Sequence, residues 1–170
     1  MDLLLPELLA ANADYQRTGF LAAPRTPRPS GRLVVLACMD ARLDLFRSLG
    51  LEVGQAHVLR NAGGRASDDA IRSLVVSTHL LGTREIGVIH HTNCGLEGVT
   101  EDDVAERTGV SGMHFLAFEH AEDSVREDVA SIRACGHFPE GVMVWGAVYD
   151  VDSGALRVMA EPATADSQPT

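Results

Sequence analysis

The chain has 170 residues, of which 45% are hydrophobic, and its mean hydropathy is close to zero. These values fit a single domain that is long enough to bury a core, and they exclude a largely disordered chain. The formal net charge is −10, and no basic stripe occurs along the sequence. This charge pattern argues against nucleic acid as a partner.

Three cysteines, Cys38, Cys94 and Cys135, are spread widely along the chain. An odd number at such spacing is not a disulfide framework, so we expect reduced thiols and a cytoplasmic protein. We expect no secretory signal, because no basic residue precedes the first leucines. We expect no membrane partner, because no apolar run approaches the roughly 18 residues that a spanning helix needs. Cys135 is interpreted as a packing residue.

The first 30 residues are predicted to form a helix and a linker. Apolar residues recur at a mostly helical spacing over residues 2–19, namely Leu3, Leu4, Leu5, Leu8, Leu9 and Tyr15. A helix with such an apolar face must pack on something, either its own domain or a second subunit. Three prolines, Pro24, Pro27 and Pro29, then predict an extended linker.

Beyond residue 30 the predicted strands alternate with helices. Strands are predicted at residues 33–37, 56–60, 85–90 and 142–149, with a short fifth strand at 155–159. Helices are predicted at residues 43–49, 67–82 and 118–136, with a short one from Thr100, and the tail from Glu161 is expected to be loose. This alternation predicts one α/β domain over residues 1–170 with a mainly parallel sheet.

Reactive side chains follow three of these strands. Cys38 comes directly after the first strand, the turn 61–64 after the second, and His91 and Cys94 after the third. Sites in parallel sheets lie beyond the carboxyl ends of the strands, so we expect these residues to meet. Two thiolates and one imidazole suit zinc, and three protein ligands leave a fourth position open for catalysis. Strand alternation and the spacing to Cys94 favour His91 over the adjacent His90 as the ligand.

Asp40 and Arg42 lie two residues apart, so both point to one side of an extended loop. Their salt bridge either only ties the loop down, or also holds Asp40 ionised to accept a hydrogen bond from zinc-bound water. If Arg42 lets go, Asp40 could become a fourth ligand and close the site. Gly63 and Gly64 either form a simple turn or present N–H groups to a bound substrate.

The motif C-x-D-x-R at residues 38–42, the run Arg-Asn-Ala-Gly-Gly at 60–64 and the motif H-x-x-C at 91–94 resemble those of the β-class carbonic anhydrases. The likeness extends over about residues 30–150. It implies Zn²⁺ on the two cysteines and His91, and a central four-stranded parallel sheet with an added edge strand. It also implies a homodimer, or a dimer of dimers, in which the N-terminal helix packs on the partner.

The reaction implied by this resemblance is reversible hydration of CO₂ to bicarbonate and a proton, by attack of zinc-bound hydroxide. Zinc lowers the pKa of its bound water, as in the three-histidine carbonic anhydrases, and two thiolates should weaken that effect. The proton acceptor is left open among His57, His90 and buffer. Some bicarbonate-regulated members carry tryptophan three residues before the first cysteine. Val35 occupies that position here, so we do not expect that allosteric site.

Other functions are compatible with parts of this pattern. Hydrolases of carbon disulfide or carbonyl sulfide share the fold and the zinc motifs, and the ligands alone cannot separate these substrates from CO₂. A non-catalytic, zinc-stabilised binding module would not need the pair Asp40 and Arg42. Thiol chemistry is disfavoured, because the sequence has no C-x-x-C and Arg42 follows Cys38 too closely for a phosphate-binding loop.

Overall fold

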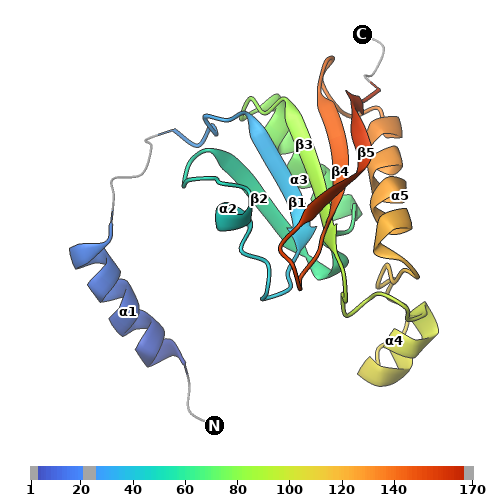
Figure 1. Cartoon of the computed structure of the whole chain (residues 1–170), viewed down its shortest axis with the longest axis horizontal. Helices are drawn as coiled ribbons and strands as arrows, with labels where there is room; N and C mark the ends of the chain where they lie inside the picture. The colour runs from blue at the N-terminus through green and yellow to red at the C-terminus, as the bar shows by residue number, and fades with distance from the viewer. Residues whose placement is uncertain (1–3, 21–25, 167–170) are drawn as a thin grey trace.

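The computed structural model describes residues 4–20 and 26–166 (Figure 1). Leu3, Pro24 and the tail residues 167–170 lie outside the described residues. The strands are β1 (Leu33–Cys38), β2 (Ala56–Asn61), β3 (Glu85–His91), β4 (Met143–Tyr149) and β5 (Leu156–Thr164). The helices are α1 (Leu5–Thr18), α2 (Leu45–Ser48), α3 (Asp68–His79), α4 (Glu101–Thr108) and α5 (Ala121–Ala134), with a 3-10 turn η1 (Ala62–Gly64).

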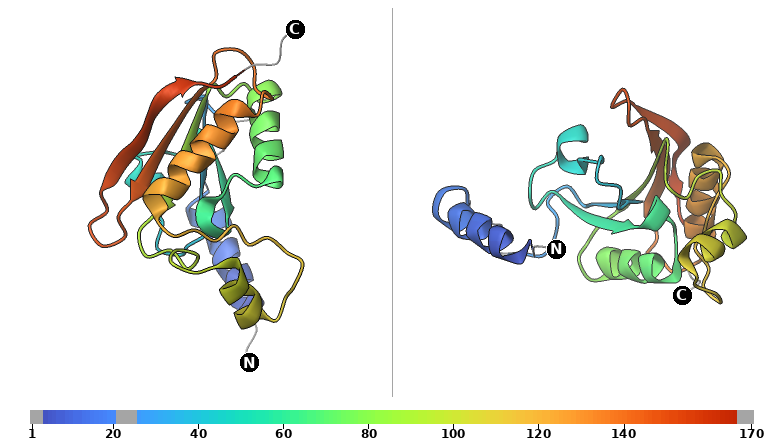
Figure 2. Two further views of the ribbon diagram at one scale, coloured as in Figure 1. Left: turned by 90° about the vertical axis from the view of Figure 1, so that its right-hand side faces the viewer. Right: turned by 90° about the horizontal axis from the view of Figure 1, so that it is seen from below.

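The sheet has the order β2-β1-β3-β4-β5, with β1 to β4 parallel and β5 antiparallel at the edge. The predicted four-stranded parallel sheet with an added edge strand is therefore confirmed. The chain steps one way from β1 to β2 and the other way from β2 to β3 and from β3 to β4. Right-handed crossovers then place α2 on one face and both α3 and α5 on the other, as Figure 2 shows.

The central strand β1 lies inside the core. Its residues Val34 to Ala37 have no exposed surface, which agrees with the aliphatic run expected of a strand covered on both faces. On one face, α5 packs against the sheet through Val125, Val129 and Ile132, all fully buried. The strand ends that carry the predicted ligands therefore project from a rigid part of the molecule.

Strand β5 extends beyond the predicted end at Met159 and reaches Thr164. The expectation of a loose tail from Glu161 is thus corrected, because residues 161–164 belong to the sheet. Ala163 and Thr164 pair with β4, and Ala165 is buried. Pro162, which lacks an N–H group, is compatible with this strand because β5 is an edge strand that needs hydrogen bonds on one side only.

Helix α5 begins at Ala121, later than the predicted start at Phe118. Phe118 lies in an extended segment, where its N–H donates to the carbonyl of Leu96 and its own carbonyl accepts from the N–H of Gly98. Phe118 is buried, and its ring stacks on that of His90, next to the predicted ligand His91. Phe118 is therefore apolar because it is buried in the segment before α5, although its spacing from the apolar residues of α5 suggested that it belonged to the helix.

Helix α1 projects away from the sheet (Figure 1), and none of its residues is buried. The large apolar side chains here that are more than half exposed are Leu4, Leu5, Leu8, Leu9, Tyr15 and Phe20. Helix α1 therefore does not pack on its own domain in this structure, which was one of the two alternatives expected from the sequence. No helix among the described residues is long and apolar enough to cross a bilayer.

We expect Gly146→Ala to destabilise the fold, because a Cβ at this position of β4 would lie 2.7 Å from Val129 Cγ2 on α5. Such overpacking costs about 1–3 kcal/mol of unfolding free energy, measurable by urea denaturation of the metal-free protein. Gly95→Ala is the matched control, since a Cβ there meets nothing within 4 Å. Equal stability of the two variants would contradict the close packing of α5 on β4.

Candidate metal centre

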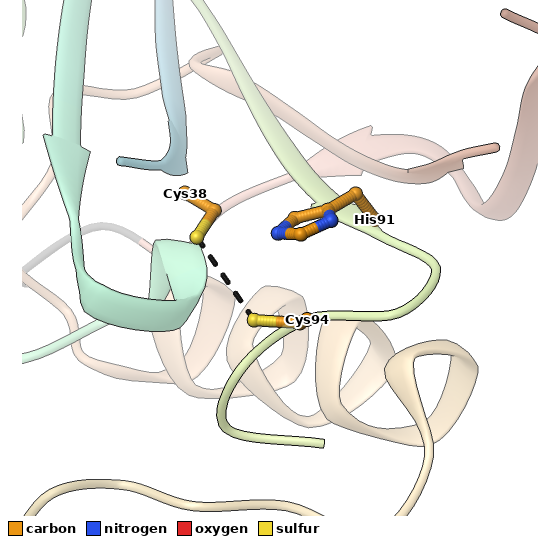
Figure 3. Close-up of side chains that lie close together, drawn as sticks. All are labelled: Cys38, His91 and Cys94. Atoms are coloured by element: carbon orange, nitrogen blue, oxygen red, sulfur yellow. Dashed lines mark hydrogen bonds between the residues drawn. The ribbon is translucent and has the colours of Figure 1, made fainter. Parts of the chain in front are cut away.

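The ends of β1 and β3 bring three predicted ligands together. Cys38 is the last residue of β1, His91 is the last residue of β3, and Cys94 lies in the turn that follows. Their side chains converge on one point (Figure 3), and the ligand atoms all lie within 4.8 Å of one another. The two Sγ atoms are 3.9 Å apart, and all three residues are buried. The expected meeting of the two strand ends is thus present.

The turn after β3 is shaped so that Cys94 faces back toward Cys38. Asn93 adopts a positive φ of 55°, a conformation that asparagine tolerates better than most residues. The N–H of Thr92 donates to the carbonyl of Tyr149, so the start of the turn stays anchored to β4. A left-handed residue directly before Cys94 then reverses the chain toward the first thiol.

The three residues fit a zinc ion. The Nδ1 of His91 lies 2.9 Å from the carbonyl of Thr92, and we assign its proton there because a carbonyl can only accept. Its Nε2 is buried and finds no hydrogen-bond partner in the described part of the chain. Two sulfurs bound to one tetrahedral zinc at about 2.3 Å would lie ~3.8 Å apart. The separation of 3.9 Å between Cys38 and Cys94 matches that geometry.

The two thiols titrate as a pair. The hydrogen bond from Cys94 holds the pKa of Cys38 below its usual range, and the same contact raises the pKa of Cys94. Burial alone would lower the pKa of His91, but the nearby Cys38 thiolate outweighs burial and raises that pKa. Without a cation, a second thiolate is thus strongly disfavoured. A divalent metal supplies the positive charge that two thiolates require.

Asp40 and Arg42 form a two-pronged salt bridge beside these ligands. Arg42 Nε and Nη2 lie 2.9 and 2.7 Å from the two carboxylate oxygens, and this guanidinium holds the pKa of Asp40 well below its usual range. Arg42 also donates to the carbonyl of Asn93 at 2.9 Å, which ties the loop after β1 to the loop after β3. Asp40 Oδ2 is 3.8 Å from His91 Nε2. Because Arg42 holds both carboxylate oxygens, the structure has the arrangement in which Arg42 has not let go of Asp40.

The turn that contains Gly63 and Gly64 packs directly against the ligand strands. A Cβ on Gly64, whose φ is +73°, would lie 2.8 Å from the backbone nitrogen of Cys38. The backbone N–H of Gly63 helps to lower the pKa of Cys38. This turn thus acts on the ligand itself. Contact of either glycine with substrate stays a prediction.

Arg60 is a site residue whose role the sequence analysis missed. Its Nε donates to the carbonyl of Cys38 and its Nη2 to the carbonyl of Asp40, at 2.8 and 2.6 Å. Its position near the end of β2, opposite Ala37, was the available signal.

The two histidines considered as proton acceptors lie in different places. His90 is buried next to the metal centre. His57 lies at the other end of β2, hydrogen-bonded to Ser77 and to the carbonyl of Pro27.

We expect Cys38→Ser to lose bound zinc, because a hydroxyl is a far weaker zinc ligand than a thiolate. The protein should contain about one zinc per chain after dialysis, and the variant should contain almost none, as measured by mass spectrometry of the metal. Cys135→Ser is the control, because this half-buried thiol packs at the edge of the core. Full zinc retention in Cys38→Ser would contradict the assignment of this ligand.

Three comparisons with known proteins agree with this geometry. A family model described as carbonic anhydrase matches residues 33–129, more than half of the chain. β-Carbonic anhydrase 1 of Mycobacterium tuberculosis H37Rv is 41% identical over 156 residues, covering 89% of this chain and 94% of that protein. A carbon disulfide hydrolase of Acidianus sp. A1-3 is 49% identical over 155 residues, covering 74% and 76%. The carbonic anhydrase structure from Streptococcus mutans is 39% identical with a TM-score of 0.85, covering 94% and 99%.

Proposed function

The chain belongs to the β-carbonic anhydrase family, and from this premise we propose that it is a zinc-dependent lyase that reversibly hydrates CO₂ to bicarbonate and a proton. Cys38, His91 and Cys94 hold the zinc. The observation that carries this assignment is the buried His91 Nε2, which has no partner in the described chain and faces two thiols beside a carboxylate fixed by arginine. A zinc ion held here supplies a water molecule of lowered pKa as the nucleophile.

Asp40 and Arg42 prepare the open side of this centre for catalysis. An ionised carboxylate can only accept hydrogen bonds. Asp40 can therefore accept one from a water molecule at the open fourth position, which turns a lone pair of that water toward substrate. Arg42 keeps Asp40 ionised and uses both prongs to hold it in place. A purely structural zinc site would have no use for such an acceptor. This pair therefore favours the enzyme over a non-catalytic binding module.

The turn that contains Gly63 and Gly64 is a further part of the site. Gly63 and Gly64 lie beside Cys38 at the same edge of the sheet, where a substrate next to the metal would also lie. We propose that this turn borders the substrate position. The fold explains the buried Gly64 without any ligand, because a side chain there would collide with the backbone of β1 and β3.

Hydrolysis of carbon disulfide or carbonyl sulfide is the alternative, favoured by the 49% identity to the Acidianus enzyme. These molecules and CO₂ are all linear and open to the same attack at carbon. The carbonic anhydrases match more completely, since the mycobacterial and streptococcal proteins are covered over 94% and 99% of their lengths. The carbon disulfide hydrolase is covered over 76% of its length. We therefore place CO₂ first.

We further propose a homodimer, or a dimer of dimers, in which α1 packs on the partner subunit. The support is the apolar face of α1, on which Leu5, Leu8 and Leu9 are each about 60% exposed.

We also propose that the protein works in a reducing compartment, the cytoplasm, because Cys38 and Cys94 must stay reduced to bind metal.

Asp40→Asn should keep its zinc but lose turnover, because the amide carries no charge and replaces one of the two acceptor oxygens with an NH2 donor. We expect kcat for CO₂ hydration to fall about 10- to 100-fold, measured by stopped-flow with a pH indicator, with zinc content determined on the same samples. Asp69→Asn, an exposed aspartate on α3, is the control. Unchanged turnover would show that the salt bridge between Asp40 and Arg42 only holds the loop in place.

Parallel rate measurements on CO₂, carbonyl sulfide and carbon disulfide test the substrate. We expect CO₂ hydration to be the fastest by a wide margin in kcat/KM, with the sulfur compounds followed by release of hydrogen sulfide. Faster turnover of carbon disulfide would transfer the assignment to the hydrolase. One bound zinc without activity on any of the three would indicate a binding module.

A further inference from the structure

A buried charge network lies directly behind the metal centre. Asp128 on α5 accepts hydrogen bonds from Arg65 Nε at 2.9 Å and Nη2 at 3.2 Å, and its Oδ2 lies 3.1 Å from His90 Nε2. The three residues come from a helix, a turn and a strand, and are 5%, 9% and 0% exposed. The network thus ties α5 to the turn that packs against Cys38 and to the strand that ends at His91.

The geometry around the network leaves its groups little freedom. The third nitrogen of Arg65, Nη1, donates to the carbonyl of Leu116 at 2.9 Å. The guanidinium carbon lies 5.4 Å from the centre of the Phe118 ring, and the His90 ring stacks on the same phenyl ring at 5.7 Å. Arg65 and His90 are therefore both oriented by one carboxylate and one aromatic ring.

Arg65 connects this network to the first thiolate. It closes the turn 61–65 through two hydrogen bonds of 2.8 Å between its backbone and the Asn61 side chain. Within this turn, Gly64 approaches the backbone of Cys38 and of Ile89 so closely that a Cβ would lie 2.8 and 3.2 Å from their atoms. Any movement of Arg65 would therefore shift the turn against the ends of β1 and β3.

His90 connects the network to the imidazole ligand. It directly precedes His91 in β3, and its Nε2 faces Asp128 and the carbonyl of Gly64. Its Nδ1 has no partner in the described chain, so the contacts at Nε2 are what orient the ring. Fixing this ring fixes the backbone from which His91 projects to the opposite side.

Stability alone does not account for a charge at position 128. Helix α5 already packs on the sheet through Val125, Val129 and Ile132. A buried ion pair is often no more stabilising than apolar residues of the same shape, and in some proteins it instead fixes one geometry for its partners. The carboxylate of Asp128 on the apolar face of α5 therefore fixes the positions of the groups that it binds.

We propose that Asp128 is a positioning residue for the metal centre. Through Arg65 it holds the turn 61–65 against the end of β1 that carries Cys38, and through His90 it holds the end of β3 that carries His91. This inference rests on the proposed zinc site formed by those residues. It assigns the rigidity of that site to α5, an element that supplies no ligand.

The test is Asp128→Asn, which keeps the shape of the side chain and removes its charge. We expect zinc to leave about tenfold faster or more, followed with a chromogenic chelator. We also expect weaker and shifted thiolate-to-metal absorption in the cobalt-substituted protein. Asp123→Asn, an exposed aspartate on the same helix, controls for the loss of charge. Ile132→Val controls for loss of stability, because it loosens the same buried face without touching the network.

Zinc release and cobalt absorption that match those of wild type, or that change only as much as in Ile132→Val, would overturn the proposal. If Asp128→Asn does not fold, Arg65→Lys decides, because lysine keeps the charge and loses the two-pronged contact. It should also release zinc faster, and wild-type behaviour would overturn the inference. A wild-type protein that binds no zinc would instead overturn the zinc site, so the two failures are distinguishable.

Discussion

The structure depends on the parallel pairing of β1 with β3. Their register sets Ala37 beside Ile89, so that the next residues, Cys38 and the histidine pair, form the ends of the two strands at the same edge of the sheet. Neither strand can shift along the other without exposing a row of side chains that are now fully buried. The spacing of the ligands is therefore set by the core of the domain.

Arginines connect the layers that surround this edge. Arg42 joins the two ligand loops at the open side, and Arg60 holds the carbonyls of Cys38 and Asp40 from the neighbouring strand. Behind the centre, Arg65 joins the turn 61–65 to Asp128 on α5. Each guanidinium offers several donors in a fixed plane, which suits a place where backbone carbonyls at strand ends need partners.

Much of this arrangement could be predicted from the sequence, because the strongest signals were local. Strand β1 is a short, bounded aliphatic run, and Cys38 follows it at once, so the ligand set required only that parallel strands end at one edge. The extension of β5 was missed because Glu161 and Pro162 look like the end of a strand, and only the edge position makes proline acceptable. Asp128 and Arg65 were missed because a charged residue, in a helix such as α5 or in a turn such as 61–65, is normally exposed to solvent. The available signal was that Asp128 shares the helix face of Val125 and Ile132.

The two carboxylate–guanidinium pairs around the metal centre, Asp40 with Arg42 and Asp128 with Arg65, differ in their exposure to solvent. The side chain of Arg42 is 49% exposed, whereas the side chains of Arg65 and Asp128 are 11% and 8% exposed. Mobile ions screen an exposed pair within about 10 Å at moderate ionic strength and affect a buried one much less. Added salt or a competing small anion therefore acts on the acceptor that faces substrate and leaves the framework behind the metal unchanged. The centre has a front that responds to the medium and a back that is insulated from it.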